Sequence, residues 1–243
     1  MMNIIITMAG LGSRFRKVGY NIPKYQISAH DKTLFEWSLL SLDSFDKAKS
    51  CYHFIVRKED NTVDFIEKTL KKLRIDNYNI IEIDYLTSGQ AETASLAIPY
   101  CKKDEEILIY NIDTYINPKF LLPSDIKGDG FIPCFNAPGD HWSFARTDEM
   151  GKVVEVREKV KISDHASLGV YYFKTAELYQ KIYNEFYSND ANTEKNEKYI
   201  APMYNYMIEK DMQVKICDIP FEKVHVLGTP EELEYFKKLD IYE

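Results

Sequence analysis

The chain opens on an apolar run that passes directly into a glycine-rich loop, Ile4-Ile5-Ile6-Thr7-Met8-Ala9-Gly10-Leu11-Gly12-Ser13-Arg14. A short apolar run that ends in glycines is typical of a buried strand followed by a loop. Residues 1–30 contain no Asp or Glu, although the whole chain has a formal net charge of −7. The same stretch contains the basic residues Arg14, Arg16, Lys17 and Lys24. Because glycines admit close backbone approach and basic side chains neutralise negative charge, the loop predicts an anion site at the end of the strand.

Length and composition limit the class of protein. The 243 residues suffice to bury a large core without disulfides or metals, and 45% hydrophobic with 28% charged residues is ordinary for a globular domain. The negative net charge disfavours nucleic acid as the main partner, since phosphate-backbone binding needs a broad basic face. No apolar segment approaches the ~20 residues of a membrane span, and the N-terminus lacks the pattern of a signal peptide. We therefore expect a cytoplasmic protein with no membrane partner.

The first half alternates short apolar strands with longer helical patterns. Strands are expected at residues 3–8, 52–56, 78–84 and 106–112, and helices at residues 33–45, 61–73 and 90–101. This alternation predicts an α/β fold with a mainly parallel mixed sheet flanked by helices, which is the Rossmann-like arrangement. Ligands of such sheets bind beyond the carboxyl ends of the strands.

The second half is richer in strands and turns. Strands are expected at residues 131–135, 143–147, 153–158, 167–173 and 213–219, and helices at residues 176–187 and 199–210. A last helix is expected after Thr229, which precedes Pro230 and two glutamates in the order typical of a helix start. The polar stretch at 188–198 predicts a mobile surface loop. No linker separates two independent domains, so a single domain is expected over residues 1–243.

The glycine loop differs from two common phosphate-binding patterns. The third glycine of the dinucleotide fingerprint would fall at position 15, which is Phe15, and the Gly-Lys-Ser/Thr of a P-loop is missing. A dinucleotide-dependent oxidoreductase is therefore disfavoured, and an absorbance change with NAD(P)H would reveal one. We expect the anion to be the triphosphate of a nucleotide, held by the amides of Gly10 and Gly12 with Arg14.

Two further charged side chains are expected beside this loop. Pro23 stiffens the chain before Lys24, so that Lys24 can supply a fixed positive charge to a triphosphate. Asp113 directly follows an apolar strand and therefore falls at the ligand edge of the sheet. A hard carboxylate there suits Mg²⁺, which takes one or two protein carboxylates and fills its shell with phosphate oxygens and water.

A third loop is formed by small and polar residues, Thr87-Ser88-Gly89-Gln90-Ala91, and leads into a helix. The N-terminus of a helix favours an anion. Gln90 offers both a donor and an acceptor, as recognition of a pyrimidine base edge requires. An ordinary capped helix accounts for the same residues equally well.

In this order and spacing, the motifs resemble those of the nucleotidylyltransferase superfamily with the GT-A-like fold. That family includes sugar-1-phosphate nucleotidylyltransferases and small cytidylyltransferases that activate phosphocholine or phosphoglutamine. Its glycine loop matches Gly10, Gly12 and Arg14, its Pro-Lys pair matches Pro23-Lys24, and its metal-binding aspartate matches Asp113.

Three motifs of the second half extend the resemblance over nearly the whole chain. The Glu-Lys motif of the family matches Glu158-Lys159, and its small-Gly-x-Tyr-x-Phe strand resembles Gly169-Val170-Tyr171-Tyr172-Phe173. Its Gly-Thr-Pro-Glu-Asp-Leu segment resembles Gly228-Thr229-Pro230-Glu231-Glu232-Leu233. Many members carry a second metal-binding aspartate two residues before this segment, where the present chain has Val226. Either Glu197 replaces it as the second metal ligand, or Asp113 holds the metal with phosphates and water alone.

The resemblance implies a reaction in which a nucleoside triphosphate and a phosphorylated acceptor give a nucleoside-diphosphate-linked product and pyrophosphate, with Mg²⁺ as cofactor. A phosphate monoester has a second pKa near 6, so the nucleophile needs no general base at neutral pH. Residues 1–128 are expected to bind the nucleotide and residues 129–243 the acceptor. The compact chain and the segment from Trp142-Ser143-Phe144 through Ile162-Ser163 to Tyr171-Tyr172-Phe173 are similar to capsule-type cytidylyltransferases, which favours CTP. A sugar-1-phosphate uridylyl- or thymidylyltransferase and a non-catalytic nucleotide sensor remain the alternatives, and homo-oligomer formation stays open.

The expected site residues follow from these motifs. The catalytic residues are Arg14, Lys24 and Asp113. The nucleotide-binding residues are Met8, Ala9, Gly10, Gly12, Ser13, Thr87, Gly89, Gln90, Ala91 and Asn111. The acceptor-binding residues are Glu158, Lys159 and Gly169, with Lys159 expected on the acceptor phosphate. The metal ligands are Asp113 and Glu197.

Overall fold

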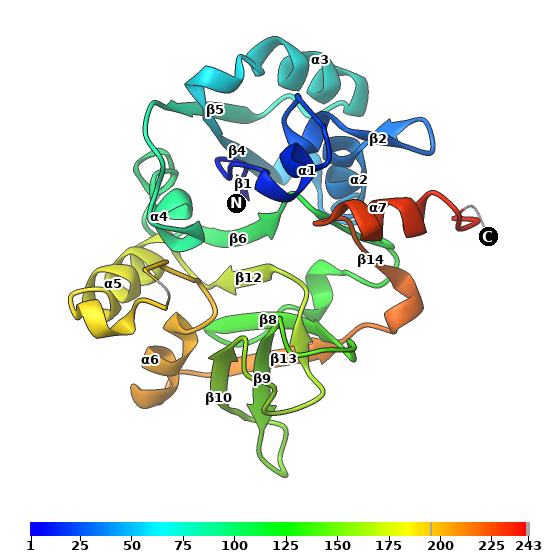
Figure 1. The fold of residues 1–243 in the computed structure, drawn as a ribbon. Coiled ribbons are helices and arrows are strands. Elements are labelled where there is room, and N and C mark those ends of the chain that lie inside the picture. The colour runs from blue at the N-terminus through cyan, green and yellow to red at the C-terminus, as the bar shows by residue number, and fades with distance from the viewer. Residues whose placement is uncertain (195, 242–243) are drawn as a thin grey trace.

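The computed structural model describes residues 1–194 and 196–241. Its upper half in Figure 1 contains four parallel strands, β1 (Met2–Thr7), β4 (Ser50–Arg57), β5 (Tyr78–Ile83) and β6 (Glu106–Asn111). The helices of this half are α1 (Ser13–Lys17), α2 (Leu34–Leu40), α3 (Val63–Leu73) and α4 (Gln90–Ser95). In register, Thr7 of β1 lies opposite Ile55 on one side and Asn111 on the other. The glycine loop and the end of β6 therefore leave the sheet side by side.

The lower half contains the strands β8 (Gly130–Phe135), β9 (Ser143–Thr147), β10 (Val153–Glu158), β11 (Ala166–Ser167), β12 (Val170–Phe173) and β13 (Val214–Asp218). The helices α5 (Ala176–Phe186) and α6 (Met203–Glu209) pack on one side of it (Figure 1). The chain then returns to the upper half through β14 (Val224–Val226), which pairs with β7 (Thr114–Ile116), and ends in α7 (Pro230–Phe236). A small hairpin of β2 (Ser28–Ala29) and β3 (Lys32–Thr33) lies beside α2.

Within the described residues, ten strands form one mixed sheet that joins the two halves. The order is β10-β9-β11-β8-β12-β6-β1-β4-β5, with β13 paired to β8. Strand β12 runs antiparallel to both of its neighbours, β6 and β8. The expected mixed α/β sheet with a strand-rich second section is confirmed.

Burial on both faces explains the continuous apolar run of β1. Ile4 and Ile6 belong to a core shared with Phe35 and Phe54, whereas Ile5 faces the opposite core with Ala94. A strand covered by helices on both sides has no polar face, so alternation is lost from its sequence. Each fully buried Ile contributes about 1.5–3 kcal/mol relative to an exposed one. In the described part of the chain, no helix combines the length and apolar character needed to cross a bilayer.

Three predicted helices differ from the structure by more than two residues at an end, and one predicted strand is interrupted. The helix predicted at 33–45 is helical only over α2, and the helix predicted at 90–101 ends with α4 before a short 3₁₀ turn at Ile98–Tyr100 that contains Pro99. The helix predicted at 199–210 begins at Met203, because Pro202 stands at its N-cap. The strand predicted at 167–173 is broken at Gly169, which adopts a left-handed φ of 74°, so that β11 pairs with β9 and β8 whereas β12 pairs with β8 and β6.

The segment at 188–198 is not a detached surface loop. It contains a 3₁₀ turn at Asp190–Asn192 and an isolated bridge between Glu194 and Glu197. The Lys198 amide donates to the carbonyl of Ser88 (2.7 Å), and the Lys198 carbonyl accepts from the amide of Ala91 (2.9 Å). These bonds attach the segment to the third predicted loop and bring Glu197 to the central cleft.

Candidate active site

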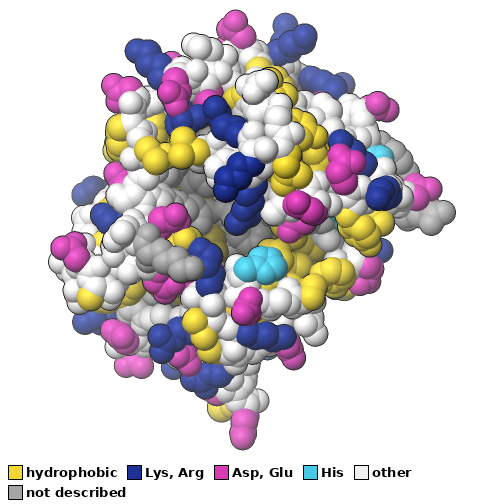
Figure 2. All heavy atoms as spheres, in the orientation of Figure 1, with side chains coloured by type: hydrophobic (Ala, Val, Ile, Leu, Met, Phe, Trp, Pro, Cys, Tyr) yellow, Lys and Arg dark blue, Asp and Glu magenta, His cyan; other side chains and the backbone are white. Residues whose placement is uncertain are grey.

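The two halves enclose a cleft of about 880 Å³ beyond the carboxyl ends of β1 and β6. Figure 2 shows this hollow, with Lys and Arg side chains along its upper margin. Of the predicted site residues, those that line the cleft are Met8, Ala9, Gly10, Gly12, Ser13, Arg14, Lys24, Thr87, Gly89, Gln90, Asn111, Asp113, Glu158, Lys159, Gly169 and Glu197. Ala91 is the exception, because it is fully buried and its amide is used by Lys198. One cleft therefore contains motifs from both halves of the chain.

The glycine loop crosses the upper wall of the cleft. Gly12 stands at the N-cap of α1, and its carbonyl accepts from the amides of Phe15 and Arg16. Phe15 is buried and anchors the short helix, whereas Ser13 and Arg14 are exposed. The loop, anchored by Phe15, therefore presents its backbone and the Arg14 guanidinium to the cleft.

Lys24 and Asp113 form an ion pair in the middle of the cleft, with 2.6 Å between Lys24 Nζ and Asp113 Oδ2. Lys24 begins a 3₁₀ turn after Pro23, and Asp113 follows the end of β6. Burial raises the pKa of the Asp113 carboxyl, but the charge and hydrogen bond of Lys24, helped by Arg14, outweigh it and hold this pKa below its ordinary value. Asp113 is therefore a carboxylate at neutral pH.

Gly89 lets the segment at 188–198 approach the third loop. A Cβ at Gly89 would lie 2.6 Å from the Lys198 carbonyl oxygen, and the Gly89 φ of 139° is one that L side chains rarely adopt. The backbone hydrogen bonds of Lys198 with Ser88 and Ala91 therefore need a residue without a side chain at position 89. Gly89 thus has a structural role at this position besides its predicted place in the nucleotide site.

Gln90, Asn111 and Gly169 meet near the centre of the cleft. The Gln90 side-chain amide donates to Asn111 Oδ1, and the Asn111 backbone amide donates to the Gly169 carbonyl (3.0 Å). A Cβ at Gly169 would lie only 2.2 Å from Asn111 Nδ2. Asn111 is thereby held between the α4 loop and the start of β12. The carbonyl oxygen and the second N–H of Gln90 are left for another partner.

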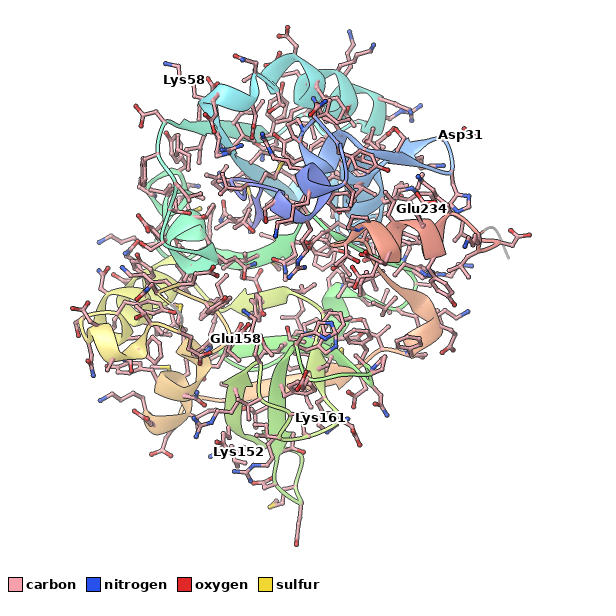
Figure 3. The ribbon with its side chains drawn as sticks, viewed as in Figure 1. Asp31, Lys58, Lys152, Glu158, Lys161 and Glu234 are labelled. Carbon is pink, nitrogen blue, oxygen red and sulfur yellow. The ribbon has the colours of Figure 1, made fainter. Side chains whose placement is uncertain are left out.

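The lower wall is formed around Glu158 at the end of β10. Figure 3 shows Glu158 at the end of this strand that faces the upper half, whereas Lys152 lies at the far end. Ser143 donates its hydroxyl to Glu158 Oε2, and Lys159 Nζ lies 3.6 Å from Glu158 Oε1. Burial raises the pKa of the Glu158 carboxyl above its ordinary value, although Ser143 and Lys159 oppose the shift.

Lys159 also contacts the ring and hydroxyl of Tyr199. Its Nζ lies 2.6 Å from Tyr199 Oη and 4.3 Å from the centre of the ring. Tyr199 stands just before α6, outside the helix in which the sequence predicted it. This contact fixes a partly exposed cation on the lower wall of the cleft.

Two glutamates line the cleft besides Glu158. Glu197 lies near Tyr199 and Glu158, and its charge raises the pKa of the Glu158 carboxyl. Glu232, in the first turn of α7, lies on the other side beside Gly228. The metal role of Glu197 stays a prediction, and Val226 also lines the cleft without a ligating atom.

Several cleft residues were not among those predicted: Thr7, Thr114, His141, Trp142, Ser143, Tyr171, Tyr199 and Glu232. Ser143 and Tyr199 could have been found only as neighbours of the Glu-Lys motif in space, since they lie 15 and 40 positions from their partners. Glu232 belongs to a Thr-x-x-Glu pattern, which is typical of a helix start, so its sequence context offers no reason to place it in the cleft.

The comparisons with known proteins agree with this fold. No protein-family model matches the chain, and no curated protein matches it. Among solved structures, it is similar to a nucleoside-diphosphate-sugar pyrophosphorylase from Vibrio cholerae RC9, with 35% identity over 97% of this chain and 100% of that one, at a TM-score of 0.90. An inositol-1-phosphate CTP transferase from T. maritima is 18% identical, and the match covers 98% of this chain and 97% of that one at a TM-score of 0.74. A CTP:phosphocholine cytidylyltransferase from Streptococcus pneumoniae is 15% identical, with 98% of both chains covered and a TM-score of 0.75.

The sheet order, the cleft and these similarities define the class of protein as a nucleotidyltransferase. The relation to the Vibrio cholerae protein extends over its full length. The chain therefore belongs to the nucleotidylyltransferase family.

Proposed function

We propose that the protein is a Mg²⁺-dependent nucleotidylyltransferase that joins CTP to a phosphorylated small molecule and releases pyrophosphate. The observation that supports this proposal most strongly is the pairing of Lys24 with Asp113 in the same cleft as Lys159. One cation stands beside the glycine loop and the other on the opposite wall. A reaction between two phosphates needs separate positive charge for each of them.

The upper half, residues 1–128, would bind the nucleotide. The amides of Gly10 and Gly12 with Arg14 would hold the triphosphate, which suits an exposed guanidinium at the start of α1. Lys24 would stabilise the charge that develops on the phosphates. Gln90 would contact the base through the carbonyl and N–H that its bond to Asn111 leaves over.

The lower half, residues 129–243, would bind the acceptor. Lys159 would hold the acceptor phosphate, since its bond to Tyr199 fixes an ammonium group on the lower wall of the cleft. Glu158 would position Lys159 through their 3.6 Å contact. Glu158 and Glu197 also add negative charge to this wall, which favours an acceptor that carries a cationic or hydroxyl group besides its phosphate.

The proposed chemistry is a substitution at the α-phosphorus. An acceptor phosphate oxygen forms a bond to the α-phosphorus, and the bond from that phosphorus to the oxygen that bridges to the β-phosphate breaks. The electron pair leaves with pyrophosphate. Since the acceptor phosphate is mostly dianionic at neutral pH, no side chain has to remove a proton. The protein contributes orientation and charge neutralisation.

The residues at the end of β6 suit a hard cation. Asp113 is ionised, and the buried Oε2 of Glu232 has no hydrogen-bond partner among the described residues. When bound there, Mg²⁺ would neutralise charge on the α-phosphate and on the leaving pyrophosphate. We propose Asp113 as one of its protein ligands.

The nucleotide and the acceptor are the finer parts of the proposal. Two of the distant structural neighbours use CTP by their descriptions, which supports a pyrimidine triphosphate in this fold. The 35% identical relative is described as a nucleoside-diphosphate-sugar pyrophosphorylase, which supports a sugar phosphate as the acceptor. Phosphoglutamine and phosphocholine are the other acceptors to test, and the proposed role is in the synthesis of capsule or other surface polysaccharide.

Pyrophosphate release tests both parts together. CTP, UTP, dTTP, ATP and GTP are each offered with sugar 1-phosphates, phosphocholine and phosphoglutamine, in the presence of Mg²⁺. We expect release with CTP and one acceptor, and its loss in Asp113→Asn. Release with UTP or dTTP and a sugar 1-phosphate instead would replace the CTP proposal by the sugar nucleotide one. Tight triphosphate binding without release from any pair would favour the nucleotide sensor.

A further inference from the structure

The helix starts of α2 and α7 share the pattern Thr-x-x-Glu but use the glutamate differently. In α2 the Thr33 side chain accepts from the Glu36 amide, and the Glu36 carboxylate accepts in return from the Thr33 amide (2.7 Å). In α7 the Thr229 side chain accepts from the Glu232 amide (3.2 Å) in the same way. The reciprocal bond from the Thr229 amide to Glu232 is missing from the described structure, and Glu232 Oε2 is buried without any partner.

The unpartnered Oε2 of Glu232 lies near Asp113 Oδ2, which accepts from Lys24 Nζ (2.6 Å). A Cβ at Gly228 would lie 3.2 Å from Asp113 Oδ2 and 3.6 Å from Glu232 Oε2, so both oxygens lie close to the same point. The pairing of β14 with β7 and the hydrogen bond from the Leu227 amide to the Asp113 carbonyl (2.8 Å) hold the two segments together. Gly228 places no side chain of its own at this point.

We infer that Glu232 supplies the second carboxylate ligand of the divalent cation at Asp113, in place of the missing carboxylate at Val226. The inference rests on the proposed function for the presence of that cation. A buried carboxylate oxygen with no donor loses its hydration without compensation, and a cation is the partner that compensates best. Two carboxylates suffice for Mg²⁺, because phosphate oxygens and water complete its shell.

Glu197 is the less suitable candidate. Its interactions are with Tyr199 and Glu158 on the acceptor wall, and Glu194 pairs with it in an isolated bridge. Glu232 instead shares with Asp113 the space beside Gly228. The two polar side-chain atoms nearest to a Cβ at Gly228 are carboxylate oxygens, and no cluster of three or more His, Cys, Asp or Glu that could hold a metal occurs among the described residues, so phosphate and water would have to supply the other ligands. The donor set therefore fits Mg²⁺ or Mn²⁺ and not Zn²⁺.

Binding of Mn²⁺ to the full-length protein tests the inference without any turnover. Mn²⁺ is titrated alone and with CTP, and the bound fraction is followed by electron paramagnetic resonance. We expect Glu232→Gln to weaken Mn²⁺ binding by about tenfold or more, because a carboxylate ligand is lost while the side-chain shape is kept. Glu231→Gln, on the exposed neighbouring position of the same turn, is the matched control and should bind Mn²⁺ as the wild type does.

Thermal unfolding separates a ligand from a structural residue. Without metal, Glu232→Gln should melt at or above the wild-type temperature, since a carboxylate with one buried, unpartnered oxygen is replaced by a neutral amide. With Mn²⁺, the wild type should gain stability that Glu232→Gln lacks. Wild-type Mn²⁺ binding by Glu232→Gln, or a loss confined to Glu197→Gln, would overturn the inference. Since CTP and acceptor are absent from the first titration, failure of the CTP proposal would leave this result intact.

Discussion

Lys24 Nζ lies 2.6 Å from Asp113 Oδ2, although the two residues are 89 positions apart in the chain. The contact exists because β1 and β6 are adjacent and parallel, so that the segments that follow them leave the same edge of the sheet. About a fifth of the Lys24 side chain and a quarter of the Asp113 side chain are exposed to the cleft. The Lys24 ammonium and the Asp113 carboxylate therefore orient each other, and each stays partly accessible to a ligand in the cleft.

Removal of either charge should slow the reaction more than it weakens binding. We expect Asp113→Asn and Lys24→Met each to lower kcat by about 10²–10³-fold, since each group acts on charge that develops during transfer. Steady-state kinetics with the best substrate pair measures this, and circular dichroism confirms the fold. Turnover within a few-fold of the wild type in both variants would exclude them from catalysis.

Gly10 offers a test of the triphosphate loop that leaves the fold alone. A Cβ at Gly10 would meet no protein atom within 4 Å, and its φ is not one that side chains avoid. Gly10→Ala should therefore keep the wild-type melting temperature and weaken CTP binding by about tenfold, because the methyl group occupies space needed by the phosphates. Calorimetric titration with CTP measures the affinity. Unchanged affinity would mean that the phosphates lie elsewhere.

Gly169→Ala should instead destabilise the protein itself. Its Cβ would lie 2.2 Å from Asn111 Nδ2, at a φ of 74° that disfavours alanine. We expect a loss of about 1–3 kcal/mol in the free energy of unfolding, together with weaker nucleotide binding as Asn111 moves. Urea denaturation gives the first quantity. A stable variant with intact Asn111 contacts would show that the backbone relaxes at this point.

Glu158→Gln should make the protein more stable and the acceptor bind less well. Burial raises the pKa of the Glu158 carboxyl, so the stability that this residue contributes is present below about pH 4.5, its ordinary pKa, and is lost as the pH rises through the raised folded value. The variant should therefore melt at a higher temperature than the wild type at neutral pH, and the difference should shrink in acid. Its KM for the acceptor should rise while its KM for the nucleotide stays unchanged. A rise in the nucleotide KM alone would assign Glu158 to the other substrate.

His53 should make folding stability depend on pH. Burial lowers the pKa of His53 from 6.5 to about 4. One ring nitrogen, Nε2, faces the acceptor Asn3 Oδ1, and the other, Nδ1, faces the donor Asn79 Nδ2, which is the pattern of a neutral imidazole. As the pH falls from 6.5 toward 4, His53 becomes protonated in the unfolded chain but stays neutral in the folded one. The free energy of unfolding therefore decreases by up to about 3 kcal/mol. Chemical denaturation at several pH values measures the slope. His53→Gln should flatten it, and an equal slope in the variant would assign the effect to other groups.

Much of the first half of the chain could be predicted from the sequence because its central strands are buried on both faces. The runs Ile4-Ile5-Ile6 and Ile107-Leu108-Ile109 are uninterrupted by polar residues, so the strands and the loops that follow them were located correctly. Asp113 was placed at the ligand edge because it follows a predicted parallel strand, and Lys24 was placed beside the glycine loop because it follows Pro23. Their direct contact was not predicted, because it depends on the adjacency of β1 and β6 and on the path of the chain from Thr7 to Lys24.

The remaining features depend on contacts between distant segments. The pairing of β7 with β14 involves three residues on each strand, too few for a sequence pattern, yet it brings Glu232 beside Asp113. The attachment of Lys198 to the loop at Gly89 rests on backbone hydrogen bonds, which do not depend on side-chain type and leave no pattern in the sequence. Tyr199 was assigned to a helix because helical spacing continues through it, whereas Pro202 delays the start of α6. Short pairings and backbone contacts are therefore what the sequence could not supply.

Strand β12 has a mechanical consequence for the cleft. It is hydrogen-bonded to β6 in one half and to β8 in the other, so the two walls are parts of one continuous sheet (Figure 1). A hinge rotation that separated the halves would have to break this ladder. The width of the cleft is therefore set by the sheet, and any adjustment to substrates of different size falls to the loops that end at Lys24, Gly89 and Tyr199. Enlarging the range of acceptors by engineering should accordingly begin with those loops and leave the strands untouched.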